Sequence, residues 1–450
     1  MKKTTVISVF VILLLTFTSD VLGQSCSGGK INGIYYTSCF TRYSNEENTG
    51  VDHLNVPITS GSGTTVAVPN DTRRLKDAIV ASLGRLVFNE GDYYIDEELP
   101  LYSYRTLEGT GRSSYLGTIN GYYPNHPSSK IIQTEDNLSI FKIGEGITDV
   151  AIRDLALVAG YGTSGTIGIL AQGGSGTNQS SISFQFSNLK FSGFSKGIYV
   201  NATNDEWQFD NIRLDHSYFE SCATGIYIDS YNSGWNITSI DFLVPANGYG
   251  IYMEKSTYTS MSMLIGNGPI SAPYAEALIY VKDHGNLSIR NAVSEGFNKD
   301  LDIDGDSIYG TGLTYPIYLM NNTFMNGISI KDSTVISTAN QFGFGLGDVP
   351  ALAKGTSRIY SIGDKFCFEG ASCETNKTYT LQDDAKLVFG SNKYKTEVDT
   401  LMLGTRLYAG LGTPANGTLY YCSNCQQTST CASGGTGAIA KRINSAWKCN

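Results

Sequence analysis

Acidic residues gather in one stretch of the chain where two of them could act as a catalytic pair. Asp215 lies in a strand-like segment with Arg213 and Asp210, and Asp241 is expected near the equivalent place one unit later. Parallel strands stack about 4.8 Å apart, so carboxyl groups on neighbouring strands could lie roughly 5 Å apart. Retaining glycosidases use two carboxyl groups at about that separation. These four residues are the catalytic candidates, and the alternative is that they are solvated residues of an outward face.

Candidate substrate contacts flank this acidic stretch. Trp207 forms an aromatic and acidic cluster with Asp205 and Glu206, and an exposed Trp there could stack on a sugar. Further along, Arg290 and Lys331 are expected on the same outward column and would supply positive charge.

A third group of acidic residues has a spacing that resembles that of calcium ligands. Asp302, Asp304 and Asp306 alternate as calcium ligands often do. An EF-hand would need a Glu six residues after Gly305, where Thr311 stands instead. A looser calcium site remains an open alternative, and the sequence assigns no metal-ligand set.

The nine cysteines predict an oxidising compartment and disulfides. The expected partners are Cys26 with Cys39, Cys367 with Cys373, and two pairs among Cys422, Cys425, Cys431 and Cys449. A zinc site at the Cys422-x-x-Cys425 spacing is the alternative for the last group. The remaining thiol, Cys222, aligns with Phe194 of the preceding unit, which predicts a buried and unreactive side chain.

The elements that must position these residues are the strands of an internal repeat. Gly-Ile pairs begin at residues 168, 197, 225 and 250, and apolar alternation follows each pair. Short period-2 segments punctuated by Gly and Asn are typical of strands. A unit of this length cannot bury its own apolar face, so the units must stack. The pattern predicts a right-handed parallel β-helix; a leucine-rich horseshoe is the main competitor, but its signature is missing.

Two columns of side chains follow from this stacking. Asn and Asp recur at one corner of the unit, where the left-handed backbone region favours them. We expect His216 to belong to this structural ladder together with Asp154, Asn188, Asn291, Asp332 and Asp364. Tyrosines that alternate outward should stack as a second ladder and could also offer a sugar-binding strip: Tyr199, Tyr227 and Tyr252.

The segment before the repeat carries a family resemblance. Asn70-Asp71-Thr72, the stretch from Gly84 to Tyr93 and the turn from Leu107 to Gly111 resemble motifs of the pectate-lyase-like β-helix superfamily. The resemblance implies a right-handed parallel β-helix. The segment from Thr72 to Ser82 is predicted as a helix that caps the first coil, with Asp71 or Thr72 as its N-cap.

The resemblance is specific for the fold and not for an activity. The superfamily includes lyases, hydrolases, epimerase-like proteins and binding proteins. The polygalacturonase motifs are not intact here, and Asp283-His284-Gly285 is the nearest piece. A carboxylate cluster for a calcium-dependent pectate lyase cannot be placed from the sequence, which argues against a standard pectinase.

The N-terminal residues predict export. Lys2 and Lys3 precede an apolar run, and Val21-Leu22-Gly23 ends with small residues, as in a secretory signal peptide. Nine Asn-x-Ser/Thr sequons fit a secreted glycoprotein. The formal charge of −9 makes nucleic acid an unsuitable partner, and no later apolar run is long enough to span a membrane. The oligomeric state is not indicated.

The expected organisation is a signal peptide (1–23), an N-terminal disulfide loop and linker (24–65), a β-helix (66–405) and a Cys-rich module (406–450). The predicted function is a secreted carbohydrate-active protein that cleaves a polysaccharide, pectin-like or other, by hydrolysis or β-elimination. The alternative is a non-catalytic glycan-binding or extracellular structural protein. The negative charge would repel a polyuronate, so that substrate would need bound calcium or the local charge of Arg290 and Lys331.

Overall fold

The computed structural model forms two compact units, Met1–Gly390 and Ser391–Asn450. It describes residues 30–31, 34–39, 55–59, 65–111, 129–160, 162–173, 179–202, 208–229, 234–305, 316–342, 351–354, 358–362, 364, 379–381, 386–389, 405–406, 411, 419–427 and 430–449. The predicted signal peptide, Cys26, Cys367 and Cys373 lie outside these residues. Within them, no helix is long and apolar enough to cross a membrane. The predicted division after residue 405 falls inside the second unit.

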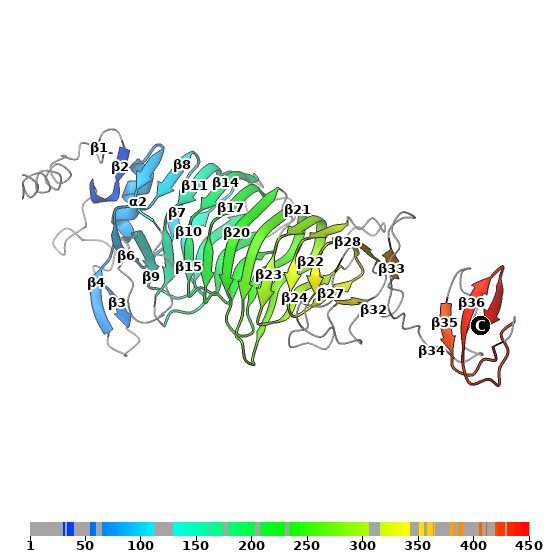
Figure 1. Cartoon of the computed structure of the whole chain (residues 1–450). Helices are drawn as coiled ribbons and strands as arrows, with labels where there is room; N and C mark the ends of the chain where they lie inside the picture. The colour runs from blue at the N-terminus through cyan, green and yellow to red at the C-terminus, as the bar shows by residue number, and fades with distance from the viewer. Residues whose placement is uncertain are drawn as a thin grey trace, which may run out of the picture. The chain divides into compact units, whose positions relative to one another are not determined.

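The first unit is a right-handed parallel β-helix whose coils each contribute strands to three sheets, as predicted (Figure 1). Sheet 1 contains β2 (Ile34–Tyr36), β5 (Arg85–Val87), β8 (Arg105–Glu108), β11 (Thr148–Arg153), β14 (Ser181–Ser187), β17 (Phe209–Asp215), β25 (Ile317–Met320), β28 (Thr334–Thr338), β31 (Arg358–Ile362) and β33 (Lys386–Phe389). Sheet 2 contains β6 (Gly91–Ile95), β9 (Ser129–Gln133), β12 (Ala156–Ala159), β15 (Lys190–Ser192), β18 (Tyr218–Glu220), β23 (Val293–Glu295), β26 (Thr323–Phe324) and β29 (Gln341–Phe342). Sheet 3 contains β7 (Leu99–Pro100), β10 (Ser139–Ile143), β13 (Ile167–Gly173), β16 (Lys196–Ala202), β19 (Thr224–Ile228), β24 (Phe297–Asp304), β27 (Ile328–Lys331), β30 (Ala351–Lys354) and β32 (Tyr379–Leu381).

Three long strands run through corners and belong to more than one sheet. They are β20 (Trp235–Leu243), β21 (Tyr249–Asn267) and β22 (Ala275–Arg290). Strand β21, for example, pairs with β19 in sheet 3 through Tyr249–Met253 and with β23 in sheet 2 through Ile265–Asn267. The ends of these strands therefore do not coincide with the corners of the coil. The pairing register shows where one sheet ends and the next begins.

A single left-handed residue forms the corner between sheet 1 and sheet 2 in successive coils. Its φ is 58° in Asp154, 51° in Asn188, 46° in His216, 55° in Ser239, 52° in Met263 and 53° in Asn291. Asn and Asp tolerate this region better than other non-glycine residues do. The prediction that His216 has a structural corner role is confirmed. Asp332 also has a positive φ, of 47°, but it follows β27 of sheet 3 and so belongs to a different corner.

Glycines beneath phenylalanine rings let the coils come together where sheet 3 begins. A Cβ on Gly225 would lie 2.6 Å from the Gly250 carbonyl oxygen and 2.6 Å from the Phe242 ring. Gly197 has the same relation to Gly225 and Phe219. The rings themselves continue from coil to coil, with Phe219 5.1 Å from Phe242. This packing explains why the repeat begins with Gly-Ile, because a side chain at the Gly would occupy the space of the ring.

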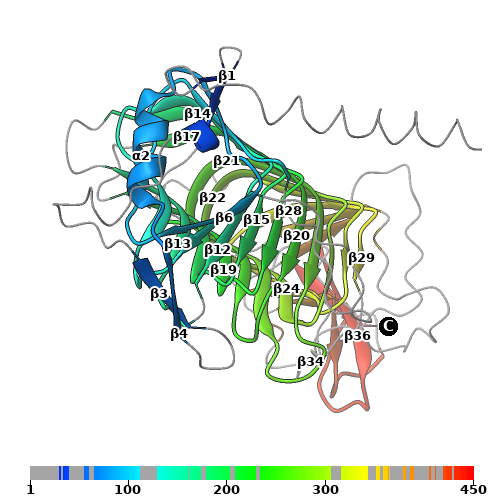
Figure 2. The ribbon, with the colours of Figure 1, turned by 90° about the vertical axis from the view of Figure 1, so that its left-hand side faces the viewer.

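The N-terminal end of the solenoid is covered by α2 (Thr72–Ala81), in front of the coils in Figure 2. Its buried residues, Leu75, Ala78 and Ile79, belong to the solenoid core. The helix starts where predicted, but the side chain that accepts the Thr72 N–H is that of Asn70, at 2.9 Å. Asp71 is the N-cap residue and makes no capping hydrogen bond with its side chain. Its carboxylate instead pairs with Arg74 at 3.0 Å.

The remaining elements of the first unit lie before this helix. They are β1 (Lys30–Ile31), a 3₁₀ turn (Thr37–Cys39), and the antiparallel pair β3 (Asn55–Thr59) and β4 (Thr65–Pro69). Cys222, the predicted inert thiol, is buried and unpaired, and burial raises the pKa of its thiol to about 12.

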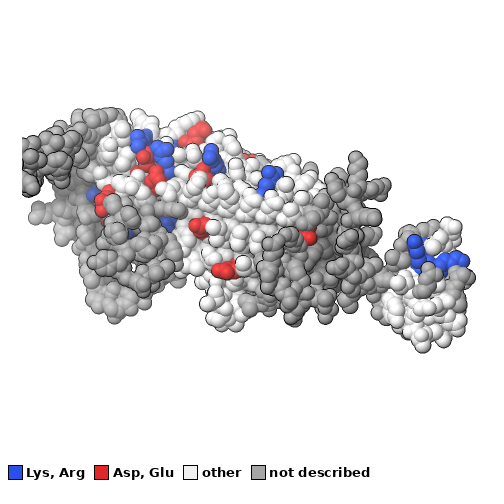
Figure 3. Space-filling view, in the orientation of Figure 1, with Lys and Arg blue, Asp and Glu red and all other residues white. Residues whose placement is uncertain are grey.

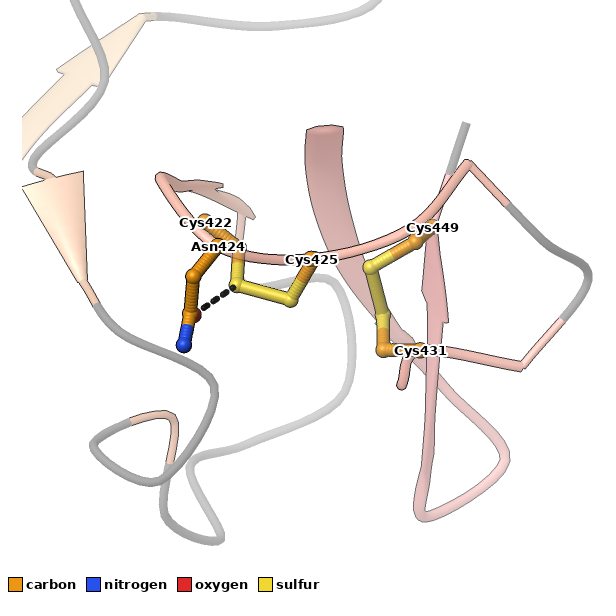
Figure 4. Close-up of a disulfide and its surroundings, with 5 residues drawn as sticks. All are labelled: Cys422, Asn424, Cys425, Cys431 and Cys449. Atoms are coloured by element: carbon orange, nitrogen blue, oxygen red, sulfur yellow. Dashed lines mark hydrogen bonds between the residues drawn. A yellow bond between two sulfur atoms is a disulfide. The ribbon is translucent and has the colours of Figure 1, made fainter. Parts of the chain in front are cut away.

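The second unit is a small sheet of β34 (Thr405–Arg406), β35 (Leu419–Cys422), β36 (Ala438–Ile443) and β37 (Ala446–Cys449). Figure 4 shows its two disulfides, Cys422–Cys425 and Cys431–Cys449. The predicted pairing of these four cysteines is confirmed, and the disulfide takes the place of the zinc alternative at Cys422 and Cys425. The sulfurs pack with Ala438, Ala440 and Trp447 in one apolar cluster.

Gly168, Gly197 and Gly225 occupy equivalent positions in successive coils, each beneath a phenylalanine ring. Gly225→Ala should lower the free energy of unfolding by about 1–3 kcal/mol, because the new methyl group overlaps backbone and ring atoms that cannot move independently. Gly144→Ala is the matched control, since a Cβ there meets no atom within 4 Å. Denaturant titrations of both variants test this. Equal stabilities of the two variants would contradict the packing role of Gly225.

The second prediction concerns Asp300, a buried acid in β24. Its carboxylate accepts hydrogen bonds from the backbone N–H and the side chain of Asn326. Burial raises the pKa of Asp300 to about 7, whereas unfolding returns it to about 4. The stability that this group contributes is therefore fully present below about pH 4 and is lost as the pH rises through 7.

We expect the free energy of unfolding to fall by a few kcal/mol, on the order of 2–4, between pH 4.5 and 8. In Asp300→Asn, which cannot ionise, this part of the pH dependence should disappear. Denaturant titrations at several pH values measure it. An equally steep pH dependence in the variant would assign the slope to other groups.

Candidate functional site

The outer face of sheet 1 carries the column on which the acidic site was predicted. Arg153 pairs in register with Ser187, and Ser187 with Asp215. The column continues through Thr238 and Ser262 to Arg290. Arg153, Ser187, Asp215 and Arg290 therefore share one column, as predicted.

Asp215 and Asp241 do not stack on neighbouring coils, so the predicted carboxylate pair is wrong. The register partner of Asp215 on the next coil is Thr238, and Asp241 pairs with Tyr218 in sheet 2. The reason is the corner at Ser239, which has a φ of 55° and turns the chain between the two positions. Asp241 therefore lies past the corner, on another sheet.

Asp215 itself is held in an ion pair. Its carboxylate lies 2.9 Å from Nε of Arg213 and 3.6 Å from Nδ1 of His216, and the residue is 5% exposed. Asp210 lies at the opposite end of β17, paired in register with Ile182, and the positive φ of Asn211 interrupts the alternation between them. Arg213 and Asp215 thus adjoin each other, but Asp210 does not join them.

The predicted substrate contacts are spread over different places. Arg290 is exposed on sheet 1, and its Nε donates to Ser288 Oγ at 3.2 Å. Lys331 lies in sheet 3, not on the predicted column, and pairs with Asp304 at 2.8 Å. Trp207, Asp205 and Glu206 lie outside the described residues.

Sheet 3 carries a tyrosine ladder on its outer face, and it is longer than predicted. The register joins Tyr199, Tyr227, Tyr252 and Tyr280 on four successive coils. Ring centroids lie 4.8 Å apart for Tyr227 and Tyr252 and 4.6 Å apart for Tyr252 and Tyr280, both stacked. Tyr199 meets Tyr227 edge to face at 5.2 Å. The expected stacking is confirmed.

Two carboxylates border the ladder at equivalent positions of adjacent coils. Asp229 and Glu254 directly follow Ile228 and Met253, which are register partners. The Tyr199 hydroxyl donates to Asp229 at 3.0 Å. Glu254 lies within 3.4 Å of the hydroxyls of Tyr227 and Tyr252. Hydroxyls and carboxylates therefore form a continuous polar row beside the stacked rings.

The tyrosine hydroxyls are protonated throughout the physiological range. Burial, reinforced by Glu254 and Asp229, raises the pKa of Tyr227 to about 12. The pKa values of Tyr199 and Tyr252 also rise well above the usual range, first through burial and then through the neighbouring carboxylates. These phenols can donate and accept hydrogen bonds, but they are poor bases.

Lys196 adds a cation at one end of the ladder. Its Nζ lies 3.7 Å from the ring centroid of Tyr199 and 4.7 Å from that of Tyr227. Partial burial lowers the pKa of this lysine, and Asp229 opposes that shift. A cation over two rings fixes their orientation and is itself held in place.

Two of the acids predicted for the alternative calcium site, Asp302 and Asp304, form ion pairs with lysines. Asp302 lies 2.7 Å from Lys299, and Asp304 lies 2.8 Å from Lys331. The third acid, Asp306, lies outside the described residues. A lysine beside each carboxylate disfavours a divalent cation there, because the two positive charges would repel.

The polar row on sheet 3 was not predicted from the sequence, because Asp229 and Glu254 lie outside the acidic clusters of the sequence. A signal was present in the repeat itself: a polar residue follows each Gly-Ile-Tyr by two positions, as Asn201, Asp229 and Glu254. In a strand these positions share the outer face with the tyrosines. The repeat could therefore have placed both columns together.

Comparison with known proteins gives structural neighbours only. No family model matches the chain, and no curated protein matches its sequence. It is similar to the A-module of Azotobacter vinelandii mannuronan C-5 epimerase AlgE6, with 11% identity and a TM-score of 0.38, over 72% of this chain and 97% of that one. It is similar to tailspike protein 3 of bacteriophage CBA120, with 12% identity and a TM-score of 0.38, over 98% and 76%. The tailspike gp42 of Acinetobacter phage vb_AbaP_AS12 gives 13% identity and a TM-score of 0.41, over 84% and 73%. The activities in these names are those of the neighbours and are not assigned to this chain.

Proposed function

We propose that the protein is secreted and binds a polysaccharide along the outer face of sheet 3. The observation that supports this is the tyrosine ladder, which continues coil by coil from Tyr199 to Tyr280, with Asp229 and Glu254 beside the hydroxyls of its first three members. A linear glycan presents hydroxyl groups at regular intervals, and carboxylates with phenolic hydroxyls are strong partners for them. The disulfides in the second unit agree with an oxidising compartment.

The ladder would hold the glycan by hydrogen bonds and not by ring stacking. Stacked rings use their faces on one another, as Tyr227, Tyr252 and Tyr280 do. What remains toward solvent is the ring edge with its hydroxyl. This argues for a neutral or amino sugar polymer, because Asp229 and Glu254 would repel the carboxylates of a polyuronate.

Replacing two hydroxyls tests this proposal without disturbing the stack. Tyr227→Phe with Tyr252→Phe should weaken binding to the preferred polysaccharide roughly 5- to 150-fold, since each lost hydrogen bond contributes about 0.5–1.5 kcal/mol. Tyr318→Phe, on the outer face of sheet 1, is the matched control. A panel of neutral, amino-sugar and uronate polysaccharides would be measured by affinity electrophoresis. Wild-type affinity in the double variant would rule out this face as the binding site.

A second candidate function, hydrolysis, is favoured by one observation. Asp229 and Glu254 occupy equivalent positions of adjacent coils, each directly after a residue of the register pair Ile228 and Met253, and stacked strands lie about 4.8 Å apart. That separation suits two carboxyl groups of a retaining mechanism, one as nucleophile and one as general acid. Asp229 and Glu254 therefore have the equivalent positions on neighbouring coils that Asp215 and Asp241 lack.

Hydrolysis would be followed as new reducing ends, together with the ultraviolet absorbance of unsaturated uronates that β-elimination would produce. Asp229→Asn and Glu254→Gln should each lower turnover by at least 100-fold if the pair is catalytic, with glycan binding retained. Asp215→Asn is the comparison for the predicted sheet 1 site. Reducing ends that persist in both sheet 3 variants but vanish in Asp215→Asn would move catalysis to sheet 1.

A further inference from the structure

We propose that the second unit holds a separate site for an anionic polysaccharide, carboxylated or sulfated, on the outer face of its sheet. This face is defined by Tyr421 of β35, Ile439, Lys441 and Ile443 of β36, and Lys448 of β37. This site is independent of the proposed glycan site on sheet 3. It would bind an anionic polymer, whereas the carboxylates beside the tyrosine ladder would repel one.

The two units differ in the sign of their charge. Residues 391–450 contain six basic and two acidic side chains, a formal charge of +4, and residues 1–390 carry −13. The sequence from residue 400 to 450 contains no Asp or Glu at all. In Figure 3 the coloured side chains visible on this unit are all basic. The lysines of its sheet therefore have no carboxylate side chain in this stretch to neutralise them.

The register places two lysines side by side on the same face. Lys441 pairs directly with Lys448 between β36 and β37. Like charges opposite each other on a sheet are destabilising. Lysine on an edge strand is a common guard against aggregation, but β36 is flanked by β35 and β37, so that explanation does not cover Lys441. An anion between the two ammonium groups would relieve the repulsion.

An aromatic ring lies on the same face in a fixed position. Tyr421 is 40% exposed and pairs in register with Ile439. A Cβ on Gly437 would lie 2.1 Å from the Tyr421 hydroxyl oxygen, so this hydroxyl lies against the glycine backbone. A held aromatic ring beside cations is suited to a sugar that carries an acidic group.

The arrangement favours a glycan over a lipid surface. Ile439 and Ile443 are 48% and 39% exposed, but Lys441 lies between them on the same strand face. Insertion into a bilayer interface needs a continuous apolar face with its basic residues on the opposite one. Alternating apolar and cationic side chains instead match a chain that presents rings and acidic groups in turn.

The experiment uses the full chain and two defined polymers, dextran sulfate and polygalacturonate, with neutral dextran as the uncharged probe. Lys441→Gln with Lys448→Gln should weaken binding to at least one polyanion tenfold or more at low salt and flatten its salt dependence. Lys76→Gln with Lys130→Gln removes two lysines from the solenoid and is the matched control. Tyr421→Ala should weaken binding with little change in the salt dependence.

The outcomes separate this site from the one on sheet 3. Tyr227→Phe with Tyr252→Phe should leave polyanion binding unchanged, so either site can fail without the other. The proposal is overturned by polyanion affinity that is undetectable or equal in the wild type and the Lys441/Lys448 variant. Stronger lysine-dependent retention on phosphatidylserine vesicles would assign the face to lipid. Lysine-dependent self-association in sedimentation would assign it to the acidic solenoid of a second copy.

Discussion

The structure depends on one packing constraint, the in-register stacking of parallel coils around a continuous apolar core. Successive coils approach closely where Gly168, Gly197 and Gly225 leave room for the phenylalanine rings. Once the register is fixed, every outward position becomes a column that runs along the solenoid. The chemistry of each face is therefore decided by which residue type occupies one position per coil, and not by any single loop.

Stacking within a column of side chains limits which of their surfaces a ligand can contact. Because neighbouring tyrosines stack, the contacts among Tyr227, Tyr252 and Tyr280 use the ring faces that a sugar would otherwise cover. The hydroxyls then point to the carboxylates of Asp229 and Glu254. The ladder thus stabilises the strands and sets a polar row at the spacing of the coils. A face built this way is regular and open, which suits a polymer better than a small molecule.

The sequence was sufficient for the fold because glycine spacing, strand alternation and corner residues all depend on local pattern. It was not sufficient for the site, because a site depends on register across coils of unequal length. Ser187 and its partner Asp215 are 28 residues apart, whereas Asp215 and its partner Thr238 are 23 apart. The pairing of Asp215 with Asp241 assumed a coil three residues longer. A shift of that size carried Asp241 around the corner at Ser239 and onto another sheet.

The two units obtain their stability in different ways, and this bears on what their surfaces can do. The solenoid has a core of stacked aromatic and aliphatic side chains. The small C-terminal sheet buries few apolar residues and relies on Cys422–Cys425 and Cys431–Cys449 to hold it. In both units the buried side chains and the cross-links, not the outward ones, carry the fold. Outward positions are consequently free to differ in charge: Asp229 and Glu254 border the tyrosine ladder of sheet 3, whereas Lys441 and Lys448 lie side by side on the small sheet. The two units therefore carry opposite formal charges, −13 for residues 1–390 and +4 for residues 391–450, and a charged ligand that one unit attracts is repelled by the other.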